Sequence, residues 1–272
     1  MSAATPESRR VTARDFARKK AAGERIVVVA AYDALFARLS EEGGVDAVLV
    51  GDSLGNVIAG YESTIPVTLE QIIHHGAAAR RGLKRALLIV DMPFLSYQAG
   101  TDDAVRNCGR VVQETGAQAL KVEGAGPRVE AAIRAVGELG VPVMGHLGFT
   151  PQSVHALGTR VQGREPASAE ALVDSARRLE DAGVFSIVLE LVPAALAERV
   201  REAVSVPTIG IGAGAGCDGQ VLVLHDLLGF TEGFSPRFLK RYASLAEETR
   251  DAVRRFATEV RDGTFPTDEH SF

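Results

Sequence analysis

The feature that most constrains the fold is a regular alternation of short apolar runs with longer segments of helical periodicity. Several runs are apolar almost throughout, as in IVVVAA and ALLIV. The eight runs are Ile26–Ala31, Asp46–Val50, Ala86–Val90, Gln118–Val122, Val141–Gly145, Phe185–Leu189, Pro207–Ile211 and Gln220–Leu224. Strands that are apolar on both faces are typical of parallel sheets covered by helices. Eight such units favour a closed (β/α)8 barrel, the TIM barrel, over an open sheet.

Segments with apolar positions at helical spacing lie between most of these runs. The predicted helices are Leu35–Glu41, Leu69–Arg81, Asp102–Glu114, Val129–Glu138, Ala169–Ala182 and Ala194–Ala203. The connection between the last two runs, Gly212–Gly219, is too short for an ordinary helix. Each predicted strand but the seventh is therefore followed by a segment long enough to cross back over the sheet.

The two ends of the chain add helices to this barrel. Thr12 and Asp15 have the spacing of a helix N-cap, so Phe16–Ala22 is predicted as an extra N-terminal helix that closes one end of the barrel. We expect a single domain over residues 1–272, with the barrel at about 25–230 and C-terminal helices at 235–262.

Charge and cysteine content exclude several classes of protein. The chain has 35 acidic residues against 30 Lys and Arg, without the basic excess of a typical nucleic-acid binder. No apolar run approaches the ~20 residues that span a bilayer. The polar N-terminus lacks the apolar core of a signal peptide. Two cysteines, Cys108 and Cys217, match neither a disulfide framework nor a zinc pattern. We therefore expect a cytoplasmic protein with no nucleic-acid or membrane partner.

Polar side chains stand at the C-terminal ends of five predicted strands. They are Asp52, Ser53, Asp91, Lys121, Glu123, His146 and Glu190. In a barrel these strand ends converge on one mouth, where the active sites of this architecture lie. Carboxylates at an apolar rim cost desolvation energy unless something pairs them, so stability alone does not explain the pattern.

Three of these side chains offer oxygen ligands on neighbouring strands. Alone, Asp52 could cap a helix and Asp91 could start a turn. Together with Glu123 they form a set of hard donors that suits Mg²⁺. Lys121 and Glu123 are two residues apart and share one face of their strand, so a simple salt bridge is the alternative.

The fifth and sixth strand ends supply a candidate base. Glu190 ends an otherwise apolar strand and could act as a general base, or could balance the charge of the metal or of Lys121. His146 could be catalytic or a structural, hydrogen-bonded histidine. Two long loops rich in Gly, Ser and Pro, Gly51–Pro66 and His146–Ser168, are expected to order over a substrate.

Longer motifs extend from about Tyr32 to Gly229. They read AYD, VGDSLGNV, STIPVTLE, DMPF, LKVEG, GHLGFTPQSV, VQGR, VLELVP and GIGAG. Together they resemble the ketopantoate hydroxymethyltransferase family of the phosphoenolpyruvate/pyruvate barrel superfamily. Two departures from the family pattern affect no charged site residue: Ala30 stands where the family often has Thr, and the His155–Arg160 stretch is slightly shortened.

The resemblance implies transfer of a hydroxymethyl group from 5,10-methylenetetrahydrofolate to 3-methyl-2-oxobutanoate, giving 2-dehydropantoate in pantothenate biosynthesis. It implies a Mg²⁺-stabilised enolate, with Asp52 and Asp91 as direct metal ligands and Glu123 attached more loosely. Glu190 is implied as the base. The residues implied to contact the substrate are Asp52, Ser53, Asp91, Lys121 and His146. The resemblance further implies a homo-oligomer, a decamer.

Two other functions are weighed against this one. One is a lyase or mutase of the same superfamily that acts on another 2-oxo acid. Several of those enzymes carry a cysteine in a loop after an inner strand, whereas Cys108 lies in a predicted helix and Cys217 in the Gly-rich turn. The other is a non-catalytic barrel that binds a small acid. Such a barrel would have no use for Glu190 beside a metal.

Overall fold

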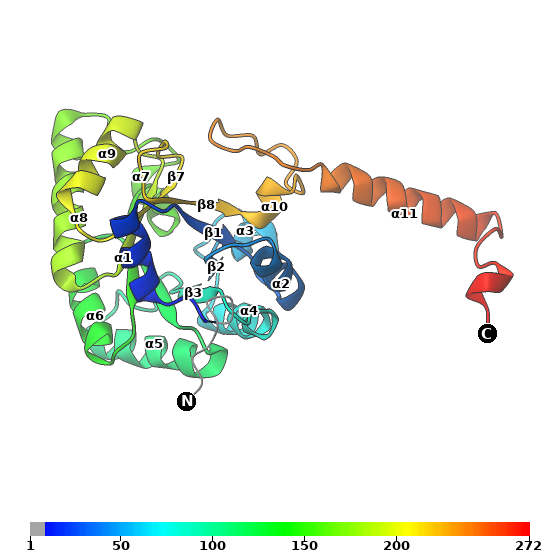
Figure 1. Cartoon of the computed structure of the whole chain (residues 1–272), viewed down its shortest axis with the longest axis horizontal. Helices are drawn as coiled ribbons and strands as arrows, with labels where there is room; N and C mark the ends of the chain where they lie inside the picture. The colour runs from blue at the N-terminus through cyan, green and yellow to red at the C-terminus, as the bar shows by residue number, and fades with distance from the viewer. Residues whose placement is uncertain (1–8) are drawn as a thin grey trace. The chain divides into compact units, whose positions relative to one another are not determined.

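The computed structural model describes residues 9–272 and contains a closed barrel of eight parallel strands (Figure 1). The strands are β1 (Ile26–Ala30), β2 (Ala47–Val50), β3 (Leu87–Asp91), β4 (Ala119–Glu123), β5 (Val143–Gly148), β6 (Ser186–Glu190), β7 (Thr208–Ile211) and β8 (Gly219–Val223). Each strand pairs with the next, and β1 pairs with β8 to close the ring. The predicted (β/α)8 barrel is confirmed, and every strand lies within three residues of its predicted bounds.

The largest difference in strand position is at β5, predicted over 141–145 and found over Val143–Gly148. Pro142 accepts a hydrogen bond from the Leu120 N–H but has no N–H of its own to donate, so the strand begins after it. The strand then continues through His146 to Gly148, which pairs with Glu190. His146 therefore lies inside a strand rather than at its end.

Helices surround the strands on the outside of the barrel (Figure 1). They are α2 (Ala34–Glu42), α4 (Leu69–Gly82), α5 (Thr101–Thr115), α6 (Pro127–Glu138), α8 (Pro166–Ala182) and α9 (Ala194–Ala203). All six predicted helices are confirmed. α6 and α8 begin earlier than predicted because Pro127 and Pro166 occupy the first helical position, where a missing N–H costs nothing. β7 and β8 are joined without a helix, as expected.

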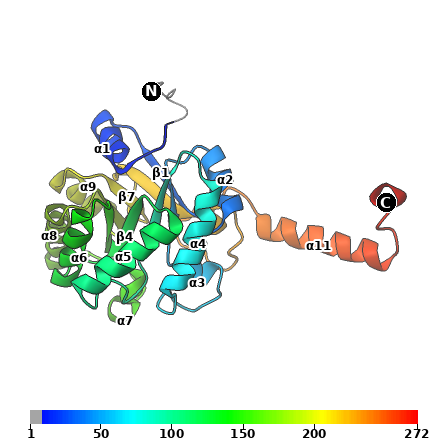
Figure 2. The ribbon, with the colours of Figure 1, turned by 90° about the horizontal axis from the view of Figure 1, so that it is seen from below.

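Short helices occupy the two predicted long loops. α3 (Leu54–Val57) lies in the first loop, and the 3₁₀ turn η2 (Pro151–Ser153) and α7 (Val154–Leu157) lie in the second. The second loop spans only 149–165, because β5 ends later and α8 begins earlier than predicted. Figure 2 shows α3 and α7 at one end of the barrel and the N-terminal helix at the other.

The predicted N-terminal helix is confirmed as α1 (Ala13–Ala22). The backbone N–H and the hydroxyl of Thr12 donate to the Asp15 carboxylate at 2.9 and 2.8 Å, which caps the helix. Phe16 is fully buried and packs edge to face against Phe185, just before β6. α1 therefore covers the end of the barrel where the strands begin.

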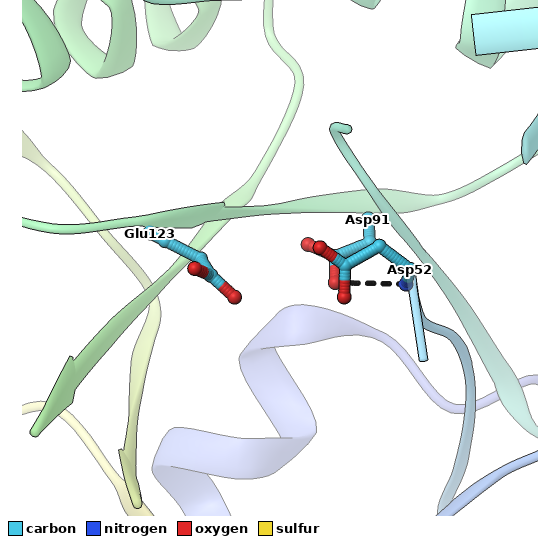
Figure 3. Close-up of side chains that lie close together, drawn as sticks. All are labelled: Asp52, Asp91 and Glu123. Carbon is cyan, nitrogen blue, oxygen red and sulfur yellow. Dashed lines mark hydrogen bonds between the residues drawn. The ribbon is translucent and has the colours of Figure 1, made fainter. Parts of the chain in front are cut away.

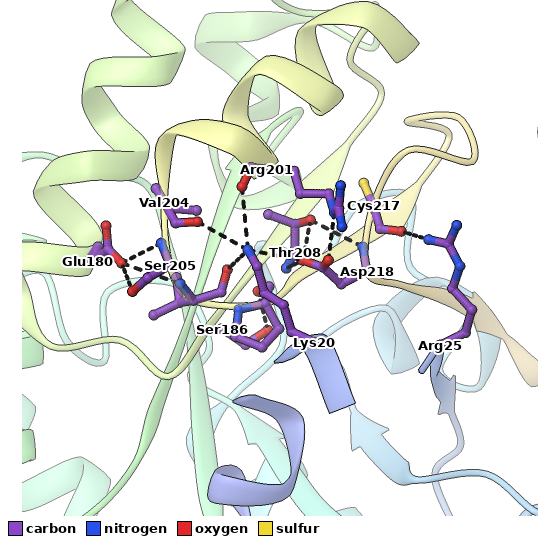
Figure 4. A network of polar contacts seen from close by, with 12 residues as sticks. Lys20, Arg25, Glu180, Ser186, Arg201, Val204, Ser205, Thr208, Cys217 and Asp218 are labelled. Atoms are coloured by element: carbon purple, nitrogen blue, oxygen red, sulfur yellow. Dashed lines mark hydrogen bonds and ion pairs between the residues drawn. The ribbon is translucent and has the colours of Figure 1, made fainter. Parts of the chain in front are cut away.

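A polar network fixes α1 to this end (Figure 4). The Lys20 ammonium donates to the carbonyl oxygens of Val204 (3.1 Å) and Val206 (2.9 Å) and lies 3.3 Å from Asp218 Oδ2. The buried Asp218 also accepts from the Thr208 N–H at 2.9 Å. Burial alone would raise the pKa of Asp218, but the Thr208 N–H and its cationic neighbours lower it. The network joins α1 to the starts of β7 and β8.

Residues from Leu224 onward form a second compact unit, separate from the unit that ends at Val223. It contains α10 (Leu224–Leu227), α11 (Leu245–Arg261) and a 3₁₀ turn η3 (Asp268–His270). The predicted C-terminal helices are right for α11 and wrong for residues 235–244. In that stretch the Arg241 guanidinium donates to two nearby backbone carbonyls and turns the chain back. The single domain over 1–272 stays a prediction.

Over residues 9–272, no helix is long and apolar enough to cross a membrane.

We expect Lys20→Met to lower the free energy of unfolding by about 1–3 kcal/mol, because buried carbonyls and Asp218 lose a charged donor. Arg14→Met is the matched control on the same helix: its side chain is exposed, and the expected change is below about 0.5 kcal/mol. Urea unfolding monitored by circular dichroism measures both. Equal midpoints for the two variants would contradict a stabilising role for the network.

Candidate active site

The ends of three adjacent strands bring the predicted site residues together. Asp52 directly follows β2, Asp91 is the last residue of β3, and Lys121 and Glu123 lie two apart in β4. The strand register places Asp91 beside Lys121 and Glu123 beside His146. All five side chains belong to residues that are at most 5% exposed. The barrel thus buries a cluster of ionisable groups at the C-terminal ends of its strands.

Three carboxylates from this cluster point toward one another (Figure 3). One oxygen each from Asp52, Asp91 and Glu123 lies within 4.8 Å of the others. The Asp52 backbone N–H donates to Asp91 Oδ2 at 3.3 Å. At an effective dielectric constant of about 20, two carboxylate charges 4.8 Å apart repel by roughly 3 kcal/mol. The arrangement is costly unless a cation offsets it.

Lys121 supplies part of the required positive charge. Its ammonium lies 2.8 Å from Asp91 Oδ2 and 3.7 Å from Glu123 Oε1, so the salt bridge considered as an alternative to the metal site is present. Burial opposes the charged form of Lys121, but the surrounding carboxylates raise its pKa. One ammonium against three carboxylates still leaves an excess of negative charge.

The remaining excess charge fits a divalent metal ion. Burial and the neighbouring carboxylates raise the pKa of Asp52 well above its usual value, and burial raises that of Asp91. Asp91 Oδ1 and Glu123 Oε1 are buried and make no hydrogen bond to any residue in the range 9–272. Three convergent carboxylates, two of which keep an oxygen without a hydrogen bond, are the kind of donor set that hard cations such as Mg²⁺ prefer.

His146 connects this cluster to Glu190. Its Nδ1 lies 3.3 Å from Glu123 Oε1, and its Nε2 lies 3.2 Å from Glu190 Oε2. Burial and Lys121 disfavour the imidazolium form, but Glu123 and Glu190 outweigh them and raise the pKa of His146 to about 9. A protonated His146 would lie within ion-pair distance of a carboxylate on each side.

Glu190 is the most accessible of the ionisable groups at this site. It is the last residue of β6, and its side chain is 18% exposed, against 5% or less for Lys121, Glu123 and His146. The apolar burial expected from the sequence is therefore only partial. The next residue, Leu191, turns the chain through a left-handed backbone conformation (φ 48°). Glu190 is thus placed at the rim of the buried cluster.

Ser53 also lies at this mouth. Its hydroxyl is 2.8 Å from the hydroxyl of the buried Tyr32. A Cβ at Gly51 would lie 2.9 Å from Ser53 Oγ and 3.8 Å from Asp91 Oδ2. The absence of a side chain at Gly51 lets the serine hydroxyl and the aspartate approach the same point.

Two further buried residues of the site, Gln152 and Tyr97, carry no strong sequence signal. Gln152 lies in η2, and its side-chain amide donates to Asp52 Oδ2 at 3.0 Å. Tyr97 lies between β3 and α5, and its hydroxyl accepts from the Glu123 N–H at 2.9 Å. The available signal was their place on loops that follow barrel strands, where functional side chains concentrate.

Comparisons with known proteins identify relatives over almost the whole chain. The family model for ketopantoate hydroxymethyltransferase matches residues 10–268. The 3-methyl-2-oxobutanoate hydroxymethyltransferase of Pelobacter propionicus is 52% identical over 97% of this chain and 98% of its own.

Two solved structures share the fold. They are 2,3-dimethylmalate lyase, a PEP mutase/isocitrate lyase superfamily member (TM-score 0.60, 17% identity, 96% of this chain and 91% of that one), and phosphonopyruvate hydrolase with oxalate and Mg²⁺ (TM-score 0.60, 14% identity, 95% and 92%).

The repulsion among the carboxylates predicts the effect of Asp52→Asn on metal-free protein. A carboxyl whose pKa is raised by folding destabilises the fold progressively as pH rises above its unfolded value, 3.8. In EDTA at pH 8 we expect Asp52→Asn to be more stable than the wild type by about 1–2 kcal/mol. The gain should shrink toward pH 4.

Urea unfolding in EDTA at several pH values measures this gain. Asp174→Asn is the control, because its side chain is 60% exposed on α8. A wild type more stable than Asp52→Asn at pH 8 would contradict the repulsion.

Proposed function

The chain belongs to the ketopantoate hydroxymethyltransferase family, and we propose from this that it transfers a hydroxymethyl group from 5,10-methylenetetrahydrofolate to 3-methyl-2-oxobutanoate, giving 2-dehydropantoate. As an enzyme of this family it is a transferase. One observation carries the proposal: three buried carboxylates lie beside a more accessible glutamate at one barrel mouth. A 2-oxo acid needs a cation for its oxygens and a base for its C3 proton.

Asp52 and Asp91 are proposed as direct ligands of Mg²⁺, with Glu123 attached more loosely. A 2-oxo acid can chelate such a metal through its keto and carboxylate oxygens, and bound Mg²⁺ would withdraw negative charge from it as a Lewis acid. The free oxygen Asp91 Oδ1 supports this assignment. The proposed substrate contacts are Asp52, Ser53, Asp91, Lys121 and His146.

Glu190 is proposed as the base. A carboxylate oxygen takes the C3 proton, and the electrons of the broken C–H bond form an enolate whose C3 bonds to the methylene carbon of the folate. Both C–N bonds from that carbon to the folate break, one water supplies the hydroxyl oxygen, and the two folate nitrogens take up the proton from Glu190 and the second proton of the water. His146 holds Glu190 Oε2 from 3.2 Å and orients the carboxylate toward the mouth. Lys121, which is buried, would place positive charge near the developing oxyanion. The loops over the mouth would exclude water from the enolate.

A lyase or mutase of the same superfamily is the alternative. The likeness to the solved lyase, at 17% identity, extends to the fold alone, whereas the transferase relative is 52% identical. Cys108 is buried in α5, and Cys217 is buried immediately before β8 begins, at the end of the barrel away from the carboxylates. Neither cysteine is available to a lyase mechanism at the mouth. These observations favour the transferase.

Family membership alone supports three further proposals. They are a role in pantothenate biosynthesis, a cytoplasmic location and a homo-oligomer, a decamer, without nucleic-acid or membrane partners. Analytical ultracentrifugation of the full chain tests the oligomer directly.

Asp91→Asn should fold but bind Mg²⁺ at least about 100-fold more weakly, because the site has few protein ligands. Calorimetric titration with Mg²⁺ measures the affinity, and Asp103→Asn on the exposed face of α5 is the control. EDTA should abolish activity and Mg²⁺ should restore it. Wild-type affinity in Asp91→Asn would remove this residue from the metal site.

Proton exchange at C3 tests the base. The protein with Mg²⁺ and 3-methyl-2-oxobutanoate in D₂O should replace the C3 proton with deuterium, which proton NMR follows. Glu190→Gln should slow this exchange by ~10²–10⁴ while Mg²⁺ and substrate still bind. Glu202→Gln, exposed on the helix that follows β6, is the control.

Two outcomes of this experiment would contradict the proposal. Wild-type exchange in Glu190→Gln would move the base elsewhere, with His146 the next candidate. No exchange by the wild type with substrate bound, in the presence or absence of folate, would contradict the enolate mechanism.

A further inference from the structure

One residue of the loop 149–165 reaches two of the three convergent carboxylates. The backbone N–H of Gln152 donates to Glu123 Oε2 at 2.9 Å, and its side-chain Nε2 donates to Asp52 Oδ2 at 3.0 Å. Gln152 is 5% exposed, so both contacts are sheltered from water. Asp52 and Glu123 come from different strands, and Gln152 links them from outside the sheet.

The side-chain amide of Gln152 has only one possible orientation. Its Nε2 faces two atoms that only accept, Asp52 Oδ2 and the carbonyl oxygen of Met92 at 2.9 Å. Its Oε1 accepts from the Tyr97 hydroxyl at 2.9 Å and from Gln98 Nε2 at 3.1 Å. Every hydrogen-bonding atom of the amide is therefore used, and rotating the amide would place oxygen against oxygen.

Tyr97 completes this support. Its hydroxyl donates to Gln152 Oε1 at 2.9 Å, lies 3.3 Å from the Glu123 carbonyl oxygen, and accepts from the Glu123 N–H at 2.9 Å. The same two residues therefore fix both the backbone and one carboxylate oxygen of Glu123. The other oxygen, Oε1, makes no hydrogen bond within the described range 9–272.

We infer that Gln152 is a positioning residue for the metal site, held in place by Tyr97. It occupies one oxygen each of Asp52 and Glu123 and so limits how each carboxylate can turn. The donors also offset part of the mutual repulsion before a cation binds. The inference rests on the proposed metal site and assigns to this site a residue outside its ligand set.

The same contacts couple the loop to the metal. A cation held by Asp52 and Glu123 would fix the positions of both carboxylates, and Gln152 contacts both of them from the loop. Mg²⁺ alone, without substrate, should therefore order the loop 149–165 through Gln152. A loop that responded only to substrate would not behave in this way.

The test variant is Gln152→Met, which keeps the length of the side chain but removes its donor and acceptor. The backbone N–H to Glu123 remains, so only the amide is tested. We expect Mg²⁺ affinity, measured by calorimetry on folded protein, to fall ~10–100-fold, as for other residues that orient metal ligands. Gln162→Met is the matched control, because this glutamine is on the same loop and its amide donates to a loop carbonyl instead.

If Gln152→Met does not fold, Tyr97→Phe provides a second test of the positioning role. It should weaken Mg²⁺ binding in the same direction but less. In the double variant with Gln152→Met the two losses should add only in part, because Tyr97 acts through Gln152 as well as directly on the Glu123 N–H. Hydrogen exchange is the second measurement: Mg²⁺ should protect the amides of 149–165 in the wild type and in Gln162→Met, and fail to do so in Gln152→Met.

Each outcome decides between two claims. No Mg²⁺ binding by the wild type would overturn the proposed metal site and the inference with it. Mg²⁺ binding by the wild type with unchanged affinity in Gln152→Met or Tyr97→Phe would overturn the positioning role alone. A lower melting temperature with wild-type Mg²⁺ affinity would make Gln152 a structural residue and nothing more.

Discussion

Mutual repulsion among three buried carboxylates is the constraint on which the rest of the site depends. Asp52, Asp91 and Glu123 hold their charges within 4.8 Å of one another and away from water. Each neighbouring feature reduces that cost: the Lys121 ammonium, the imidazole of His146 and the amide of Gln152. A site of this kind stores free energy that a divalent cation releases when it binds.

The stabilising polar network and the candidate active site lie at opposite ends of the barrel. At the end where the strands begin, Asp218 and Lys20 are opposite charges with well-matched partners, and α1 covers them. At the other end, carboxylates face one another and Glu190 is left partly accessible. The stabilising network and the strained cluster lie on opposite sides of the same strands, so the strained cluster need not contribute to holding the fold together.

The fold was predictable from the sequence because the period of apolar residues reports burial directly. The convergence of the carboxylates was predictable for the same reason: polar groups such as Asp91 stand out at the end of an apolar strand. Gln152 was not, because a loop glutamine looks the same whether its amide meets water or a buried carboxylate. The helix prediction for residues 235–244 was wrong for another reason. There the Arg241 guanidinium donates to the Thr231 carbonyl oxygen, a contact that the pattern of apolar residues does not reveal. The chemical roles of the site residues stay predictions.

The internal ammonium of Lys121 has a consequence for the barrel without a cation. Because the chain carries its own counter-ion against Asp91, part of the negative charge of the cluster is balanced by the protein itself. Without a bound cation the site is therefore a smaller burden on the fold than three carboxylates without any cationic neighbour would be.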